Sequence, residues 1–111
     1  MNAARVIVRD LRTFRNRLIS FRNIGAFLGA IRKDTPTEDK RNNTNRVSRR
    51  ELAEWINHSL RANELPISLH TIWRIEAGKN MFGGYMMRVI QIARALDCNI
   101  KFRSAKTFIE S

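Results

Sequence analysis

The residue types that most often perform catalysis or bind metals are few and scattered in this sequence. The 111 residues include one cysteine, Cys98, and two histidines, His58 and His70, twelve positions apart with no acid-rich or cysteine partner nearby. A zinc site needs about four such ligands, and a metal-dependent nuclease needs clustered carboxylates. Gly83-Gly84 alone is a turn and no phosphate-cradling loop. We therefore expect no catalytic residue, no metal and no cofactor, and the chain is not predicted to be an enzyme.

The sequence is instead rich in basic residues. Twenty-one Lys and Arg against ten Asp and Glu give a formal net charge of +11, which favours a polyanionic partner such as DNA, RNA or anionic lipid. Eight of these cations lie in residues 1–34, which hold two acidic residues. No stretch approaches the roughly 20 apolar residues that a membrane-spanning helix needs, so we expect a cytoplasmic protein without membrane contact.

The N-terminal segment carries two patterns with helical period. Four apolar residues with spacings of four, three and four predict one face of a helix: Ile7, Leu11, Phe14 and Leu18. Four arginines recur in the same way: Arg5, Arg9, Arg12 and Arg15. We expect residues 1–22 to form a basic helical extension that holds a polyanion without reading its sequence.

A second helix and a polar loop are expected next. Residues 24–33 continue the helical pattern, and Gly25 and Gly29 would let a neighbouring element approach closely. Residues 34–46 contain no large apolar side chain and predict a polar loop, either solvated or acting as an arm on a nucleic-acid backbone.

Two capped helices follow the loop. Ser48 and Glu51 form a capping box before a helix whose buried face is Leu52, Ala53 and Ile56. Pro66 interrupts the helical pattern. Ser68 then caps a short helix with Ile72 and Ile75 facing inward and Gly78 as its end.

A last helix and a strand complete the predicted elements. Residues 86–96 predict a helix whose inner face is formed by Met86, Val89, Ile90 and Ala93. The alternation of Ile100 and Phe102 predicts a short strand, with Phe108 and Ile109 as its partner strand, and Cys98 is expected to be a small buried residue.

Two short helices of this kind in a basic domain suggest a helix-turn-helix. Ser48-Arg-Arg-Glu-Leu-Ala-Glu-Trp-Ile56 resembles the second helix of the lambda-repressor-like (Cro/cI, XRE-type) helix-turn-helix family, and Ile67-Ser-Leu-His-Thr-Ile-Trp-Arg-Ile-Glu-Ala-Gly-Lys79 resembles its recognition helix. Residues 24–32 and 86–96 are similar to its first and fourth helices. The resemblance implies a mainly α fold, a bundle of about five helices with a short C-terminal strand or hairpin. The expected parts are a basic extension (1–22), the helix-turn-helix domain (23–98) and a C-terminal strand or tail (99–111).

The resemblance also implies roles for individual residues. The positions expected to read bases are Ser68, Leu69, His70, Trp73 and Arg74. The positions expected to contact phosphates are Ser48, Arg49, Arg50, Lys79 and Asn80. Arg32 and Glu76 are expected to form a structural ion pair. Read from the residues alone, Trp73 fits either groove contact or partial burial, and His70 either a base contact or plain exposure.

One departure from the family bears directly on function. About nine extra residues, around Asn57–Pro66, separate the two helices that the family joins by a tight turn. The inserted residues either extend the second helix or loop out, and the angle between the two helices depends on which.

We expect a sequence-specific regulator of transcription that binds double-stranded DNA, a bacterial or phage-encoded repressor acting as a homodimer on a palindromic operator. One alternative is an antitoxin or anti-regulator that also grips a protein partner. Its partner surface would come from residues 81–87, 5–21 or 100–109. The other alternative is a general nucleic-acid-binding protein, which the charge alone supports equally well.

Overall fold

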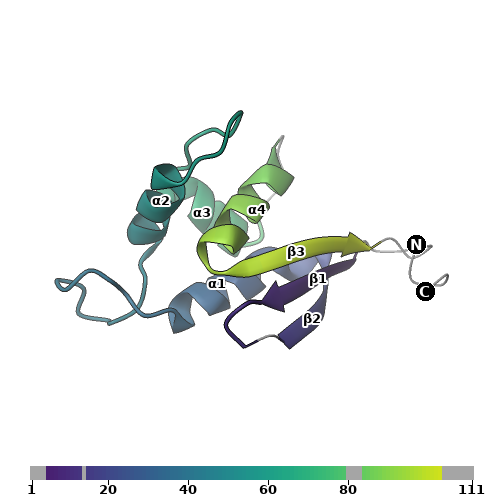
Figure 1. Cartoon of the computed structure of the whole chain (residues 1–111), viewed down its shortest axis with the longest axis horizontal. Helices are drawn as coiled ribbons and strands as arrows, with labels where there is room; N and C mark the ends of the chain where they lie inside the picture. Colours follow the sequence, from purple (N-terminus) through teal and green to yellow (C-terminus); the bar gives the residue numbers. More distant parts are fainter. Residues whose placement is uncertain (1–4, 14, 80–83, 104–111) are drawn as a thin grey trace.

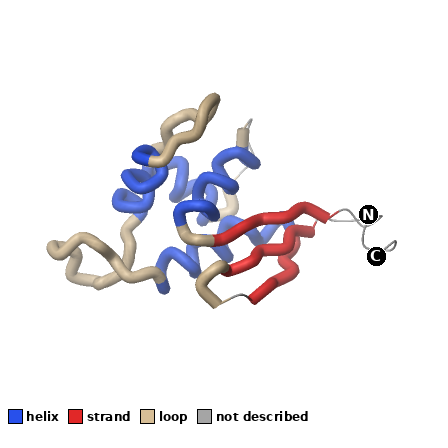
Figure 2. Tube along the Cα trace, in the orientation of Figure 1, coloured by secondary structure: helices blue, strands red, loops and turns tan. Residues whose placement is uncertain are grey.

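The computed structural model describes residues 5–13, 15–79 and 84–103, which form four α-helices and a three-stranded antiparallel sheet (Figure 1). In chain order the elements are β1 (Arg5–Asp10), β2 (Arg15–Ser20), the short 3-10 helix η1 (Phe21–Asn23), α1 (Ile24–Asp34), α2 (Arg49–His58), α3 (Leu69–Glu76), α4 (Tyr85–Ala95) and β3 (Cys98–Arg103). The strand order is β2–β1–β3, and the helices gather on one side of the sheet (Figure 2).

The predicted helix over residues 1–22 is wrong, and so is the predicted mainly α bundle of about five helices. The strands β1 and β2 pair as a β-hairpin instead. The run Val6, Ile7 and Val8 is β-branched throughout, which favours extended backbone. Alternation along the strand buries Val6 and Val8 almost completely, whereas Ile7 points to the opposite face and is only half-buried.

In the hairpin, the apolar residues and the arginines that were expected on helix faces lie on different strands and in the turn. Ile7 and Leu18 lie directly opposite each other on the paired strands. The predicted stripe of arginines does not form, because Arg9 lies in β1, Arg12 in the turn and Arg15 in β2. A spacing that fits a helix thus also fits a hairpin, in which residues far apart in sequence become cross-strand neighbours.

The predicted strand around Ile100 is confirmed. β3 pairs antiparallel with β1, with Lys101 opposite Ile7 and Ile100 opposite Val8. The first and last strands of the described chain therefore lie side by side. The partner strand expected at residues 108 and 109 lies outside the described residues.

The helix expected over residues 24–33 is confirmed as α1. Gly25 also makes the close approach that was expected of it, because a Cβ at this position would overlap the backbone carbonyl oxygen of Ile75 in α3. Gly29 lies one turn further along, where a Cβ would come within 3.1 Å of the Glu76 Cγ. The two glycines thus bring the α1 backbone against α3.

Half of the predicted capping box at α2 is present. The Ser48 hydroxyl accepts a hydrogen bond from the Glu51 backbone N–H at 3.1 Å. The Glu51 carboxylate does not return to Ser48 but accepts hydrogen bonds from the Thr37 hydroxyl and the Glu38 backbone N–H. This carboxylate therefore ties the loop after α1 to the start of α2.

The predicted start and inner face of α3 are confirmed. Ser68 accepts a hydrogen bond from the Thr71 backbone N–H at 3.1 Å, and Ile72 and Ile75 are completely buried. In α4, Val89 and Ala93 are buried as predicted, but Ile90 is 41% exposed and Ile92 occupies the core instead.

The core lies between the helices and the inner face of the sheet. Its buried residues come from every α-helix and from β1 and β3, and include Val8, Leu28, Leu52, Ile56, Ile72, Ile75, Ile92 and Cys98. None of the described helices is long and apolar enough to cross a membrane.

Candidate nucleic-acid interface

Helix α3 is buried on one side and presents large side chains on the other. Ile72 and Ile75 are fully buried, whereas Leu69 is 44% and Trp73 41% exposed. The rings of His70 and Trp73 stack with centroids 5.7 Å apart and an interplanar angle of 23°. An exposed apolar and aromatic row on a short, capped helix is a surface suited to contact another molecule.

A cation extends this row at the end of α3. The Lys79 Nζ lies 6.0 Å from the centroid of the Trp73 ring, within the range of a cation–π interaction. Asn80, which was expected to act with Lys79 at a phosphate, lies outside the described residues.

The other two residues expected to read bases, Ser68 and Arg74, are less available for contact with DNA. The Ser68 hydroxyl accepts from the Thr71 N–H and lies 3.1 Å from the Thr71 hydroxyl, so it is engaged as the helix cap. Arg74 is half-buried, unlike its exposed neighbour Trp73. The structure therefore brings together Leu69, His70 and Trp73 out of the five candidates.

The ion pair expected between Arg32 and Glu76 is present in the structure. The Arg32 Nε and Nη2 donate to the two Glu76 carboxylate oxygens at 2.7 and 3.0 Å, and Nη1 donates to the Val47 carbonyl oxygen at 2.8 Å. The Arg32 and Glu76 side chains are 9% and 6% exposed. This bidentate pair joins α1 to the end of α3 and to the segment before α2.

Arg49 adds a second guanidinium to the same carboxylate. Its Nε donates to Glu76 Oε1 at 2.9 Å, and its side chain remains 36% exposed. Two guanidinium groups around one carboxylate leave a net positive charge at this point. The exposed Arg50 follows on α2, and Ser48 is engaged as the helix cap.

A small cleft joins these groups. It has a volume of about 190 Å³, and Lys33, Arg49 and Trp73 line it together with the Glu76 carboxylate. The small residues Ala26, Gly29 and Ala77 complete its wall. The cleft therefore places an exposed aromatic ring of α3 beside two cations from two other helices.

Lys33 is the one charged residue lining this cleft that the sequence analysis did not predict to be functional. The sequence carries a usable signal, because Gly25, Gly29 and Lys33 follow at intervals of four and so share one helix face. That face packs on α3. Arg49 was expected at a phosphate, but its bond to Glu76 had no sequence signal.

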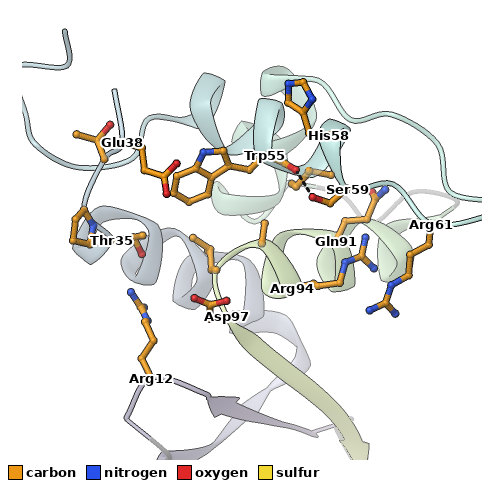
Figure 3. A pocket seen from close by; sticks show the side chains of 15 residues that line it. Arg12, Thr35, Glu38, Trp55, His58, Ser59, Arg61, Gln91, Arg94 and Asp97 are labelled. Atoms are coloured by element: carbon orange, nitrogen blue, oxygen red, sulfur yellow. Dashed lines mark hydrogen bonds between the residues drawn. The ribbon is translucent and has the colours of Figure 1, made fainter. Parts of the chain in front are cut away.

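A larger groove of about 860 Å³ lies elsewhere, between the end of α2, the end of α4 and the β1–β2 turn (Figure 3). Trp55 and His58 line it from α2, and Arg12, Arg94 and Asp97 contribute charges of both signs. The residues of the α3 row do not line this groove. No group of three or more metal-ligating side chains occurs in the part of the chain that the structure describes.

Two of the arginines at the groove, Arg12 and Arg94, form ion pairs with carboxylates of the protein. Arg94 donates to both carboxylate oxygens of Glu64, at 2.9 and 2.7 Å. These bonds, together with one from the Arg61 backbone, lower the pKa of Glu64 from its ordinary value of 4.5 to about 2. The groove thus offers mixed, partly neutralised charge, in contrast to the positive cleft beside α3.

No protein-family model matches the sequence, and comparison with curated proteins and with solved structures yields no match.

Proposed function

We propose that this protein is a sequence-specific regulator that binds double-stranded DNA by placing the exposed side of α3 in the major groove. The observation that carries the proposal is the outward row of Leu69, His70 and Trp73 on a helix whose other side is anchored in the core. A helix about 10–12 Å wide fits the major groove, and its first turn reaches the base edges.

The side chains of the row suit distinct parts of the groove. Leu69 offers an apolar contact for a thymine methyl group, and His70 offers a ring nitrogen for a hydrogen bond to a base edge. The stack of His70 on Trp73 restricts both rings, which lowers the conformational entropy lost on binding. Base recognition is therefore assigned to Leu69 and His70, with Trp73 as their support and groove wall.

Cations from three parts of the chain surround the row and suit phosphate contacts. Lys33 and Arg49 line the cleft against Trp73, Lys79 lies over the Trp73 ring, and Arg50 is exposed at the start of α2. Such contacts fix the position of a protein on the duplex without reading its sequence. The Glu76 carboxylate orients Arg49 for this role from its buried site.

Further details of the proposal come from the helix-turn-helix resemblance of residues 48–79. We propose that α1–α4 correspond to the four helices of the lambda-repressor-like family, and that the sheet is an addition to them. On that basis the protein is a cytoplasmic, bacterial or phage-encoded repressor that acts as a homodimer on a palindromic operator, since one recognition helix covers only a half-site.

A gel-shift titration against a pool of randomised duplexes, with unlabelled nonspecific duplex as competitor, tests the proposal. We expect a fraction of the pool to stay bound at competitor levels that displace the rest. Uniform displacement of the whole pool would contradict sequence-specific binding and would favour the general nucleic-acid-binding alternative.

A further inference from the structure

The face of the sheet turned away from the helices is a separate surface from the α3 row. The strand register places six of its residues in two cross-strand rows whose side chains the structure describes in full. The first row is Leu18, Ile7 and Lys101, and the second row is Asn16, Arg9 and Asn99. We call these six residues the outer sheet face.

The outer sheet face is solvent-accessible because the helices cover only the other side. Val6, Val8 and Cys98 alternate with its residues along β1 and β3 and are 0, 2 and 2% exposed. By contrast, Arg9 and Lys101 are exposed, and Leu18 is 44% exposed.

The chemistry of the outer sheet face is that of hydrogen-bond donors and positive charge. It contains no acidic residue. Within the described part of the chain, none of its four polar side chains has a hydrogen bond or ion pair to another residue: Arg9, Asn16, Asn99 and Lys101. A guanidinium flanked by two amides, with an ammonium group on the adjoining row, matches the spaced oxygens of a phosphodiester backbone.

The edge strand β2 continues this positive surface around the side of the sheet. Arg15 and Arg17 of β2 lie opposite Asp10 and Val8 of β1, and therefore on the inner side of the sheet, yet both are exposed. Pairing of β2 with a second copy of the chain would bring these arginines against their equivalents, an arrangement that opposes edge-to-edge association. A polyanion, by contrast, gains from cations on both sides of the edge.

We propose that the outer sheet face is a second DNA-binding surface that contacts the phosphodiester backbone of a duplex independently of its sequence. The inference rests on the proposed DNA-binding role but not on base reading by α3. On this surface Arg9 of the first strand acts together with Lys101 from the far end of the chain.

The salt dependence of binding to a short duplex of random sequence tests this surface. The variant is the double substitution Arg9→Ala/Lys101→Ala, and its matched control is Lys40→Ala/Arg61→Ala, which removes the same charge from two exposed loop positions. Each lost phosphate contact reduces the slope of log affinity against log salt by about 0.9. We expect the slope of the sheet variant to fall by about 1.8 and that of the control to stay unchanged. Equal slopes for the two variants would overturn the proposal.

A third variant separates binding by the cations of this face from binding by its exposed apolar side chains. Leu18→Ser removes exposed apolar area and leaves every cation in place, so affinity for the duplex should stay within about twofold of the wild type. A loss as large as that of the double variant would overturn the assignment of the binding to the cations of this face. Affinity for random sequence does not depend on Leu69 or His70. This experiment therefore tests the outer sheet face whether or not α3 reads bases.

Discussion

The side-chain amide of Asn57 exchanges two hydrogen bonds with the backbone of Ile67. Asn57 Nδ2 donates to the Ile67 carbonyl oxygen at 2.9 Å, and the Ile67 N–H donates to Asn57 Oδ1 at 2.8 Å. The pair closes the base of residues 58–66, so the extra residues between α2 and α3 loop out while the two helices stay packed (Figure 1). The long connection is thereby compatible with a helix pair that presents α3 outward.

Asn57→Ala should lower the free energy of unfolding by about 1–3 kcal/mol, because the Ile67 N–H and carbonyl lose their partners beside a buried side chain. Urea denaturation measures the change. The control is Asn43→Ala, in an exposed loop position without a side-chain hydrogen bond in the described chain. Equal losses of stability in Asn57→Ala and Asn43→Ala would show that the two hydrogen bonds between Asn57 and Ile67 do not stabilise the fold.

Gly25→Ala should destabilise the protein by about 3 kcal/mol or more, since the new methyl group would overlap the Ile75 backbone carbonyl, which cannot move without shifting α3. Gly29→Ala should cost clearly less, because its neighbour is the Glu76 side chain. Thermal unfolding of the two variants gives the comparison. Equally small losses of stability in the two variants would contradict the close approach of α1 and α3.

Acid should weaken the fold through Glu64. Its folded pKa of about 2 lies below the ordinary 4.5, so its stabilising contribution is complete above pH 4.5 and disappears as the pH falls toward 2. Glu64→Gln should therefore flatten the loss of stability across that window, as followed by urea midpoints at successive pH values. Glu54→Gln, at an exposed position without an ion pair in the described residues, serves as the control and should keep the wild-type profile.

The sequence allowed several local features to be predicted because short-range chemistry determines them. Ser48 and Ser68 each begin a helix with a side chain that accepts a backbone N–H, and the inward isoleucines of α3 follow the helical period. The Arg32–Glu76 pair was reached through the family resemblance and is present in the structure.

The main errors in the predicted fold arise because strand pairing joins residues that are far apart in the sequence. Whether Ile7 and Leu18 share a helix face or oppose each other on two strands depends on β3, which contributes the other neighbour of β1 from the far end of the chain. Local spacing does not contain that information. In the same way, nothing around Arg49 indicates that Glu76 of a different helix will accept its hydrogen bond.

Replacing Lys79 by Ala should weaken binding to all DNA sequences alike and reduce the salt slope by about 0.9, because a phosphate contact carries no sequence information. Leu69→Ala should instead change the ranking of sequences and leave the slope unaltered. Fluorescence anisotropy with a small set of duplexes at several salt concentrations measures both. A Lys79 variant that reorders the sequences would contradict the assigned roles.

In vitro selection from a random duplex library, with the wild-type protein and with Leu69→Ala/His70→Ala, measures whether α3 reads a DNA sequence. We expect the wild type to enrich a motif of two inverted half-sites whose centres lie about one helical turn, or a multiple of it, apart. For the double variant we expect a different half-site, or none. No enrichment with the wild type, or the same motif with both proteins, would contradict base reading by α3.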